Sequence, residues 1–161
     1  MAIVEILHGR PCYVCGSADP DAHQHGQPAI QVRFAWNDVV QEVRCLATLG
    51  PGCQGAPGHA HGGALFGLLD EAMGAACWMS GHKVMSANVQ IDYRKPVKLG
   101  DTLEVVGRIS QVQGRKVHTL GELRRDGVLV TEAKGLFVTS ERHAWDLLAP
   151  DGTATTLGVD G

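Results

Sequence analysis

Two adjacent acidic residues, Asp70 and Glu71, interrupt a stretch that is otherwise apolar from Ala64 to Met79. An ionised carboxylate among apolar neighbours must be paired, hydrogen-bonded or shifted toward its neutral form. Carboxylates retained in such places often accept a proton or attack an electrophile. We therefore expect Asp70 to be a catalytic residue. The alternative is a structural acid, bonded to the backbone or to a histidine across an interface.

The segment around Asp70 has the pattern of a long buried helix. Its apolar residues recur at helical spacing and cover nearly all of its surface, as shown by Ala64, Leu65, Leu68, Leu69, Ala72, Met73 and Ala76. Gly67 and Gly74 are explained if another backbone approaches the helix closely. The preceding segment, Gly50 to Gly58, is too rich in glycine and proline for regular structure. We expect Gly62 and Gly63 to present free backbone N–H groups at an anion-binding helix N-terminus.

The spacing between Gly62 and Asp70 has a consequence for assembly. Eight residues separate them, and a helix rises about 1.5 Å per residue, which places them roughly 12 Å apart. They cannot flank one carbonyl group. A site that uses both the helix N-terminus and Asp70 therefore needs two antiparallel copies of the helix across a two-fold axis, and we expect a homodimer.

Composition places the chain among ordinary soluble proteins. It has 161 residues, of which 44% are hydrophobic and 19% charged, with a net charge of −3. We expect no membrane association, no signal peptide and no nucleic-acid partner, although a local basic patch could bind a phosphorylated small molecule. The expected domains are an N-terminal extension with a CxxC loop (1–29), a folded domain (30–140) and a C-terminal tail (141–161).

The five cysteines are an odd number and favour free thiols in a reducing cytoplasm. Cys12 and Cys15 form a CxxC pair that His23 and His25 follow closely, and this set could bind zinc. The spacing from Cys15 to His23 is short for a zinc finger. We therefore expect a plain loop, no metal and no cofactor, with zinc as the open alternative.

Beyond the helix, the pattern changes to consecutive antiparallel strands. Turn residues separate the β-rich segments Val84–Tyr93, Thr102–Val112, Lys116–Arg125 and Leu129–Thr139. Upstream, Ile30–Trp36 and Val39–Leu49 read as a hairpin around Asn37 and Asp38. The expected fold class is α+β, with one long buried helix wrapped by an antiparallel sheet of about six strands.

Three features together resemble the hot-dog-fold acyl-CoA thioesterases, in the thioesterase-superfamily-member and phenylacetate-degradation branch. They are the segment Pro57-Gly58-His59-Ala60-His61-Gly62-Gly63-Ala64, the acid Asp70, and the strand Val84–Tyr93 continuing to Pro96. The similarity runs from about Ile30 to Ser140. It implies hydrolysis of an acyl-coenzyme A thioester in a homodimer or homotetramer, with coenzyme A as part of the substrate.

The resemblance also implies roles for individual residues. Asp70 matches the general base or nucleophile, and Gly62 the residue whose backbone N–H polarises the thioester oxygen. His61 matches a histidine that shapes the loop, and Ser86 a hydroxyl near the attacking water. The expected substrate-binding residues, including those that would hold coenzyme A, are Gly63, Asn88, Tyr93, Arg94, Lys95, Pro96, Lys98, Arg115 and Lys116.

This sequence departs from the family at one place, and several of the roles have structural alternatives. Some relatives carry a water-orienting amide six places before the histidine, where this chain has Gly55 beside Gln54. His61 could simply cap the helix, Ser86 could bond only locally, and the cations could form a solvated face. The alternative function is a non-catalytic hot-dog module that binds acyl-CoA or another apolar ligand. The dehydratase branch needs a histidine–acid pattern that is absent here.

Overall fold

The computed structural model describes residues 3–5 and 30–140, and all structural statements refer to these residues. The possible zinc ligands Cys12, Cys15, His23 and His25 and the tail 141–161 lie outside them. The elements in chain order are β1 (Ile3–Glu5), β2 (Ile30–Val32), β3 (Ala35–Asn37), β4 (Glu42–Leu49), a 3₁₀ turn (Pro51–Cys53), α1 (Gly62–Met79), β5 (Val84–Tyr93), β6 (Thr102–Gln113), β7 (Lys116–Arg125) and β8 (Val128–Thr139).

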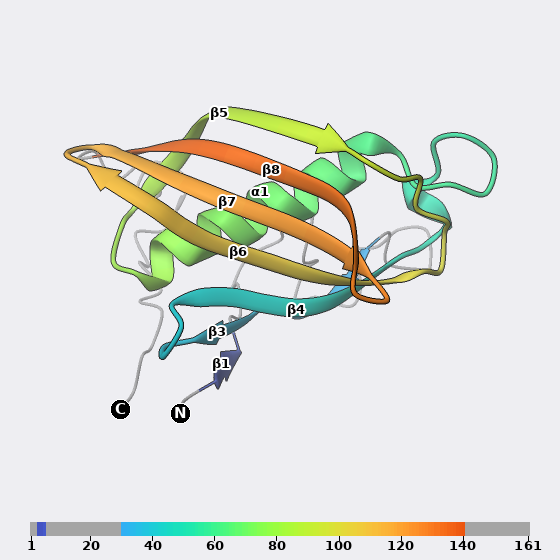
Figure 1. The fold of residues 1–161 in the computed structure, drawn as a ribbon, viewed down its shortest axis with the longest axis horizontal. Coiled ribbons are helices and arrows are strands. Elements are labelled where there is room, and N and C mark those ends of the chain that lie inside the picture. Colours follow the sequence, from blue (N-terminus) through green and yellow to red (C-terminus); the bar gives the residue numbers. More distant parts are fainter. Residues whose placement is uncertain (1–2, 6–29, 141–161) are drawn as a thin grey trace, which may run out of the picture.

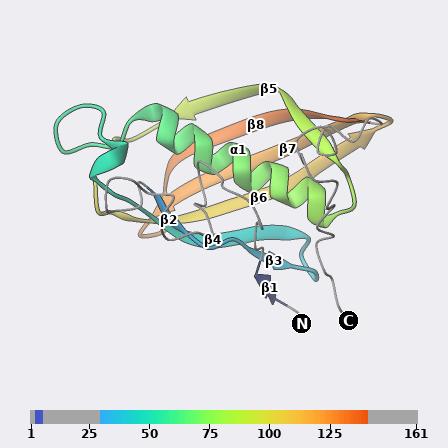
Figure 2. The same cartoon turned by 180° about the vertical axis from the view of Figure 1, so that it is seen from behind.

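One antiparallel sheet curls around one helix, which confirms the expected hot-dog fold (Figures 1 and 2). The strand order is β1-β3-β4-β6-β7-β8-β5, and β2 also pairs with β4. The sheet has 8 strands because the segment expected at 30–36 is divided into β2 and β3, and because β1 pairs with β3. The expected hairpin turn is confirmed, although β4 begins only at Glu42.

Alternating side chains give the sheet one face toward α1 and one toward solvent. In β7, Val117, Thr119, Gly121 and Leu123 are buried, and the residues that alternate with them are partly exposed. The β7–β8 turn has Asp126 at φ 51° and Gly127 at φ 75°. Two successive positive φ angles are typical of the type I′ turn, whose twist matches that of paired strands. Tight turns thus hold the long strands in the register that encloses the helix.

The helix packs closely against glycines in the sheet. A Cβ on Gly107 in β6 would lie 2.4 Å from the backbone oxygen of Ala72, and one on Gly121 would lie 3.0 Å from Leu69. The sequence predicted that another backbone approaches the helix at Gly74, and this prediction was wrong. A Cβ on Gly74 would meet only the Phe137 ring, at 3.6 Å. The room for close packing comes from residues without side chains on the sheet.

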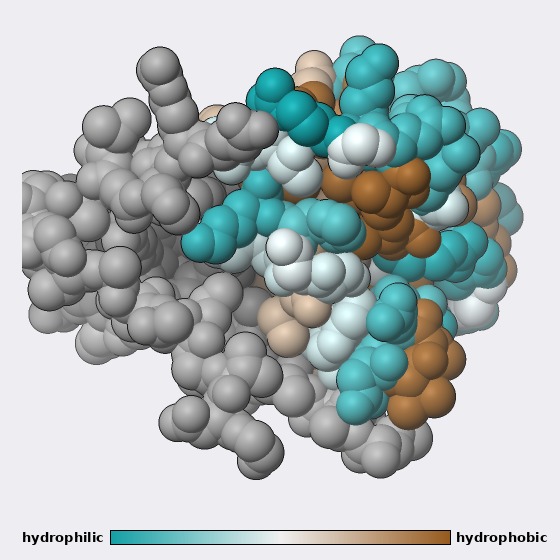
Figure 3. All heavy atoms as spheres, turned by 90° about the vertical axis from the view of Figure 1, so that its left-hand side faces the viewer, coloured by the Kyte–Doolittle hydropathy of each residue, from teal (hydrophilic) through white to brown (hydrophobic). Residues whose placement is uncertain are grey.

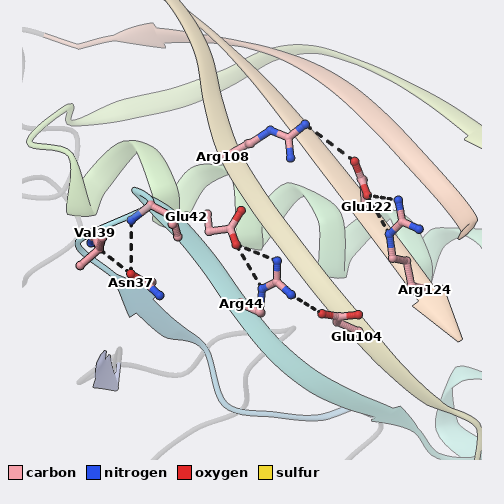
Figure 4. A network of polar contacts seen from close by, with 9 residues as sticks. Asn37, Val39, Glu42, Arg44, Glu104, Arg108, Glu122 and Arg124 are labelled. Carbon is pink, nitrogen blue, oxygen red and sulfur yellow. Dashed lines mark hydrogen bonds and ion pairs between the residues drawn. The ribbon is translucent and has the colours of Figure 1, made fainter. Parts of the chain in front are cut away.

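Charged side chains on neighbouring strands pair across the outer face of the sheet (Figure 4). Arg44 in β4 bridges Glu42 at 2.8 Å and Glu104 in β6 at 2.6 Å. Arg124 in β7 contacts Glu122 at 2.7 Å. These exposed pairs each contribute little to stability, typically below about 1 kcal/mol. They leave this part of the outer face of the sheet charged and solvated.

Candidate active site

The N-terminus of α1 is capped by a histidine side chain. Nδ1 of His61 accepts the N–H of Gly63 at 2.9 Å, and the His61 carbonyl accepts the N–H of Ala64 at 3.0 Å. The amide of Gly62 has no acceptor among the described residues. The expected pair of free glycine amides is therefore reduced to one, because His61 occupies the other. Since Nδ1 accepts a hydrogen bond, a neutral His61 carries its proton on Nε2.

The glycine-rich loop before α1 is held by backbone hydrogen bonds. The N–H of His61 donates to the Cys53 carbonyl at 2.7 Å, and that of Ala60 donates to the Val97 carbonyl at 2.9 Å. Part of the segment expected to be irregular forms a 3₁₀ turn that begins at Pro51, a position that proline favours. These bonds place the start of α1 beside the segment that follows β5.

Gly55 occupies the place where some relatives carry an amide. A Cβ at Gly55 would lie 2.9 Å from Cα of His61, so the loop packs on His61 too tightly for a side chain here. The neighbouring amide does not fill the role in this structure, because Oε1 of Gln54 accepts the N–H of Gly58 at 3.1 Å. The side chain of Gln54 instead holds the loop that leads to α1.

Asp70 lies in the middle of α1 and is partly buried. Its Oδ1 is buried and accepts no hydrogen bond from the residues that the structure describes. Burial raises the pKa of Asp70 above the usual value, the adjacent Glu71 raises it further, and hydrogen bonding by Ser86 lowers it in part. A desolvated carboxylate with an unused oxygen is a stronger base than an exposed aspartate. This arrangement suits a group that must take a proton from water.

A bulge in β5 separates Ser86 from Asn88. Ser86 pairs with the buried Phe137 of β8 and faces α1, whereas Asn88 pairs with Leu136, the next residue of β8. The extra residue, Ala87, therefore reverses the side-chain alternation and turns Asn88 to the outer face. The structure brings Ser86 to Asp70 but leaves Asn88 on the opposite side of the sheet.

The end of β5 returns to the start of α1. Tyr93 pairs with the buried Thr131 of β8, and its hydroxyl donates to the Gly62 carbonyl at 2.9 Å. Oγ1 of Thr131 has no hydrogen-bond partner among the described residues. Tyr93 is thus in direct contact with the residue that provides the free amide.

Three of the cations that were expected to bind coenzyme A, Arg94, Lys95 and Lys98, follow Tyr93 and lie beside the glycine-rich loop. Arg94 forms an ion pair with Glu132 in β8 and is charge-compensated. Lys95 is exposed. The backbone of Lys98 forms an isolated antiparallel β-bridge with that of His59, in the loop before α1. The two lysines are the better candidates for phosphate binding, since the charge of Arg94 is already paired.

An ion pair that the sequence did not reveal fixes this segment. Arg125 donates to Asp101 at 2.6 Å and to the Pro96 carbonyl at 3.4 Å. Asp101 also accepts the N–H of Lys98 at 3.0 Å. The Arg125 guanidinium is the main reason that the pKa of Asp101 is lowered. The sequence predicted a turn at residues 98–101 and a substrate-binding role for Lys98, but nothing local indicated Arg125 as the partner of Asp101.

The other two expected cations, Arg115 and Lys116, lie at the other end of the molecule. Arg115, in the β6–β7 turn, donates to the Thr139 carbonyl at 3.1 Å, whereas the N–H of Arg94 donates to the Val130 carbonyl. Nine residues of β8 separate these two carbonyls, which corresponds to about 30 Å at 3.3 Å per residue. Figure 3 views the end with the β6–β7 turn, where polar residues surround smaller apolar groups. Within one protomer, Arg115 and Lys116 do not join Lys95 and Lys98.

No group of three or more histidine, cysteine or acidic side chains within residues 3–5 and 30–140 is arranged to hold a metal ion. In the same residues, no helix has the length and apolar character needed to cross a membrane.

Comparison with known families agrees with the fold and the loop–helix motif. Residues 57–132, which include the end of the glycine-rich loop, α1, the strands β5 to β7 and the start of β8, match the model of the Thioesterase superfamily. The matched region thus resembles the Thioesterase superfamily, in agreement with the motif around His61 and Asp70.

Individual relatives carry related names. The chain is 34% identical over 105 residues to the acyl-coenzyme A thioesterase THEM4 of Xenopus laevis, covering 64% of this chain and 47% of that protein. It is 36% identical over 109 residues to THEM4 of Bos taurus, covering 66% of this chain and 44% of that protein. The chain thus spans about half the length of these relatives.

Solved structures show the same fold. A thioesterase superfamily protein is 36% identical, with a TM-score of 0.64, covering 67% of this chain and 53% of that one. A Streptococcus mutans protein solved with acetyl CoA has a TM-score of 0.60 at 24% identity, covering 62% of this chain and 82% of that one. At this identity, the second likeness concerns the fold alone.

Proposed function

We propose that this chain is an acyl-CoA thioesterase that hydrolyses an acyl-coenzyme A thioester to the free acid and coenzyme A. The observation that carries the proposal is the Asp70 carboxylate, which has one buried oxygen without a described partner and Ser86 beside it. The similarity to proteins named acyl-coenzyme A thioesterase supports the same reaction.

The proposed chemistry needs an oriented base and one oxyanion donor. Asp70 either takes a proton from water as the water attacks the thioester carbonyl, or attacks the carbonyl itself to form an anhydride that water then cleaves. The free amide of Gly62 stabilises the negative charge that develops on the carbonyl oxygen. The carbon–sulfur bond breaks, and the proton that water gave up goes to the coenzyme A thiolate. Ser86 orients the Asp70 carboxylate or the water.

The geometry of α1 requires that the two groups come from different protomers. Gly62 and Asp70 lie on one continuous helix, so their separation along its axis is about 12 Å. We infer a homodimer in which the two α1 helices lie antiparallel, with Gly62 of one copy facing Asp70 of the other. A pairing of two such dimers into a tetramer is compatible with this arrangement.

The same two-fold axis accounts for the separated cations. An antiparallel arrangement of helices brings the N-terminal end of one protomer next to the opposite end of its mate. Lys95 and Lys98 of one copy then lie on the same side of the assembly as Arg115 and Lys116 of the other. We propose that together they bind the phosphates of coenzyme A. The buried thiols of Cys45 and Cys77 form no disulfide within the described residues, which fits a reducing cytoplasm.

The direct test is hydrolysis of a panel of acyl-CoAs with short, long and aromatic acyl groups. We expect release of free coenzyme A, detected with a thiol reagent, and loss of release in Asp70→Asn with dimerisation unchanged. Tight acyl-CoA binding without release for any chain length would instead support a non-catalytic binding module.

Subunit complementation tests the shared site. Asp70→Asn removes the base, and Gly62→Pro removes the amide hydrogen at the first position of the helix. Because proline also places a Cβ against the Tyr93 ring, circular dichroism must first show that the Gly62→Pro protein is folded. Each homodimer should be inactive. Mixed dimers contain one intact site, so co-refolded protein should regain about a quarter of wild-type activity if the subunits mix randomly. No recovery in verified mixed dimers would contradict a site built from both protomers.

A further inference from the structure

The contact between Tyr93 and Gly62 links the end of β5 to the start of α1. The Tyr93 hydroxyl donates to the Gly62 carbonyl at 2.9 Å, although the two residues are 31 positions apart in the sequence. The hydroxyl has a single hydrogen, and this hydrogen bond uses it. Tyr93 therefore cannot also donate a hydrogen bond to a substrate oxygen in this arrangement.

The Tyr93 ring leaves little room for a side chain at residue 62. A Cβ on Gly62 would lie 3.0 Å from the Tyr93 hydroxyl oxygen and 3.1 Å from Cζ. The φ angle of Gly62 is outside the left-handed range that favours glycine, and the residue is the first of α1. The restriction on a side chain here thus comes from the neighbouring ring rather than from the local backbone conformation.

The contacts around Gly62 leave its amide as the one unused donor of this helix turn in the described structure. His61 holds the amide of Gly63, and the His61 carbonyl accepts from Ala64. We propose that Tyr93 is a positioning residue, which fixes Gly62 so that its amide is directed at the thioester oxygen. This inference rests on the proposed thioesterase function, and it differs from the expected role of Tyr93 as a contact to coenzyme A.

Kinetics with two substrates separate the two roles of Tyr93. Tyr93→Phe removes the hydrogen bond and keeps the ring. We expect kcat to fall roughly tenfold to a hundredfold, with little change in KM, because a misplaced donor stabilises the transition state less. The loss should be the same for an acyl-CoA and for the N-acetylcysteamine thioester of the same acyl group. A rise in KM for acyl-CoA alone, or unchanged kinetics, would overturn the proposal.

A stability measurement tests the contact without reference to activity. Gly62→Ala should lower Tm in the wild-type background, because the new Cβ meets the Tyr93 ring, and should not lower it in Tyr93→Ala. Gly74→Ala is the matched control on the same helix, where a Cβ meets only Phe137 at an ordinary 3.6 Å. Its effect should be the same in both backgrounds.

The two measurements distinguish the possible failures. An equal effect of Gly62→Ala on Tm in both backgrounds would show that Tyr93 does not constrain Gly62, which overturns the inference even if the protein is a thioesterase. A wild-type protein without thioesterase activity would instead count against the proposed function and against the catalytic consequence assigned to Tyr93.

Discussion

Gly107 in β6 lies directly under Ala72 of α1, with room for no side chain between the strand and the helix backbone. A Cβ there would be 2.4 Å from the Ala72 carbonyl oxygen. Backbone atoms cannot move aside as a flexible side chain can. This pair therefore sets how closely the sheet wraps the helix that carries Asp70.

Gly107→Ala should consequently destabilise the protein strongly. Forcing extra volume into a packed interior typically costs 1–3 kcal/mol, and contact with backbone places this change at about 3 kcal/mol. Chemical denaturation monitored by circular dichroism measures the loss. Arg108→Ala, at the next residue on the solvated face, should cost less than about 1 kcal/mol. Equal effects of the two substitutions would be inconsistent with this packing.

Asp70→Asn should abolish most activity and increase stability at neutral pH. Loss of the base should lower kcat by about 10²- to 10⁴-fold.

The folded-state pKa of Asp70 is raised, so the folded protein binds this proton more tightly than the unfolded chain does. Ionising Asp70 therefore costs folding stability at neutral pH, and the cost disappears below the unfolded pKa of about 3.9. Denaturation of Asp70→Asn and wild type at pH 7 and near pH 3 should show a higher free energy of unfolding for the variant only at pH 7. A lower free energy of unfolding for the variant at pH 7 would contradict this prediction.

The pH profile of the wild-type enzyme should report the same carboxylate. The proposed hydrolysis requires an ionised Asp70, so kcat/KM should fall as pH decreases through the folded-state pKa of this residue. Since burial and Glu71 raise that pKa, the fall should begin at a higher pH than for an ordinary aspartate. Removing the charge of Glu71 with Glu71→Gln should move the midpoint to lower pH. A midpoint that stays in place would show that Glu71 does not influence Asp70.

Substitutions of His61 separate capping from chemistry. His61→Ala removes the acceptor for the Gly63 amide and should cost about 0.5–2 kcal/mol, as for other N-caps. Asparagine is a strong N-cap residue, so His61→Asn should restore most of this stability and, if His61 acts through the cap, most of the activity. Thermal unfolding and kcat measured on both variants provide the test. A stable His61→Asn protein without activity would assign His61 a direct contact with the substrate.

Charge reversal tests the proposed phosphate site. Lys95→Glu combined with Lys98→Glu should raise KM for acyl-CoA by about tenfold or more, since each lost charge-assisted hydrogen bond is worth 1.5–3 kcal/mol. The N-acetylcysteamine thioester has no phosphates, so its KM should be unchanged. Lys134→Glu, which changes an exposed cation on the outer face of β8, is the control. An equal effect on both substrates would argue against phosphate binding.

Local pattern was sufficient for the long helix, for the four long strands that follow it and for selecting Asp70 as a candidate, but not for β1 or for the division of residues 30–36 into two strands. Helical spacing placed the helix, and alternation with glycine-containing turns placed the four long strands that follow it, because these signals lie within a few neighbouring residues. The acid in the apolar helix identified Asp70 in the same way. The positions of Ser86 and Gly62 on the fold followed from the strand and helix in which they lie.

The tertiary structure decided how these residues are oriented and held. The bulge at Ala87 turned Asn88 to the outer face, His61 occupied the amide of Gly63, and the β6–β7 turn lay about 30 Å from Arg94 by strand rise. The partners Tyr93 and Gly62, or Arg125 and Asp101, are far apart in the sequence. Such contacts depend on sheet register and on the angle at which the helix packs, and no local pattern of residues specifies either.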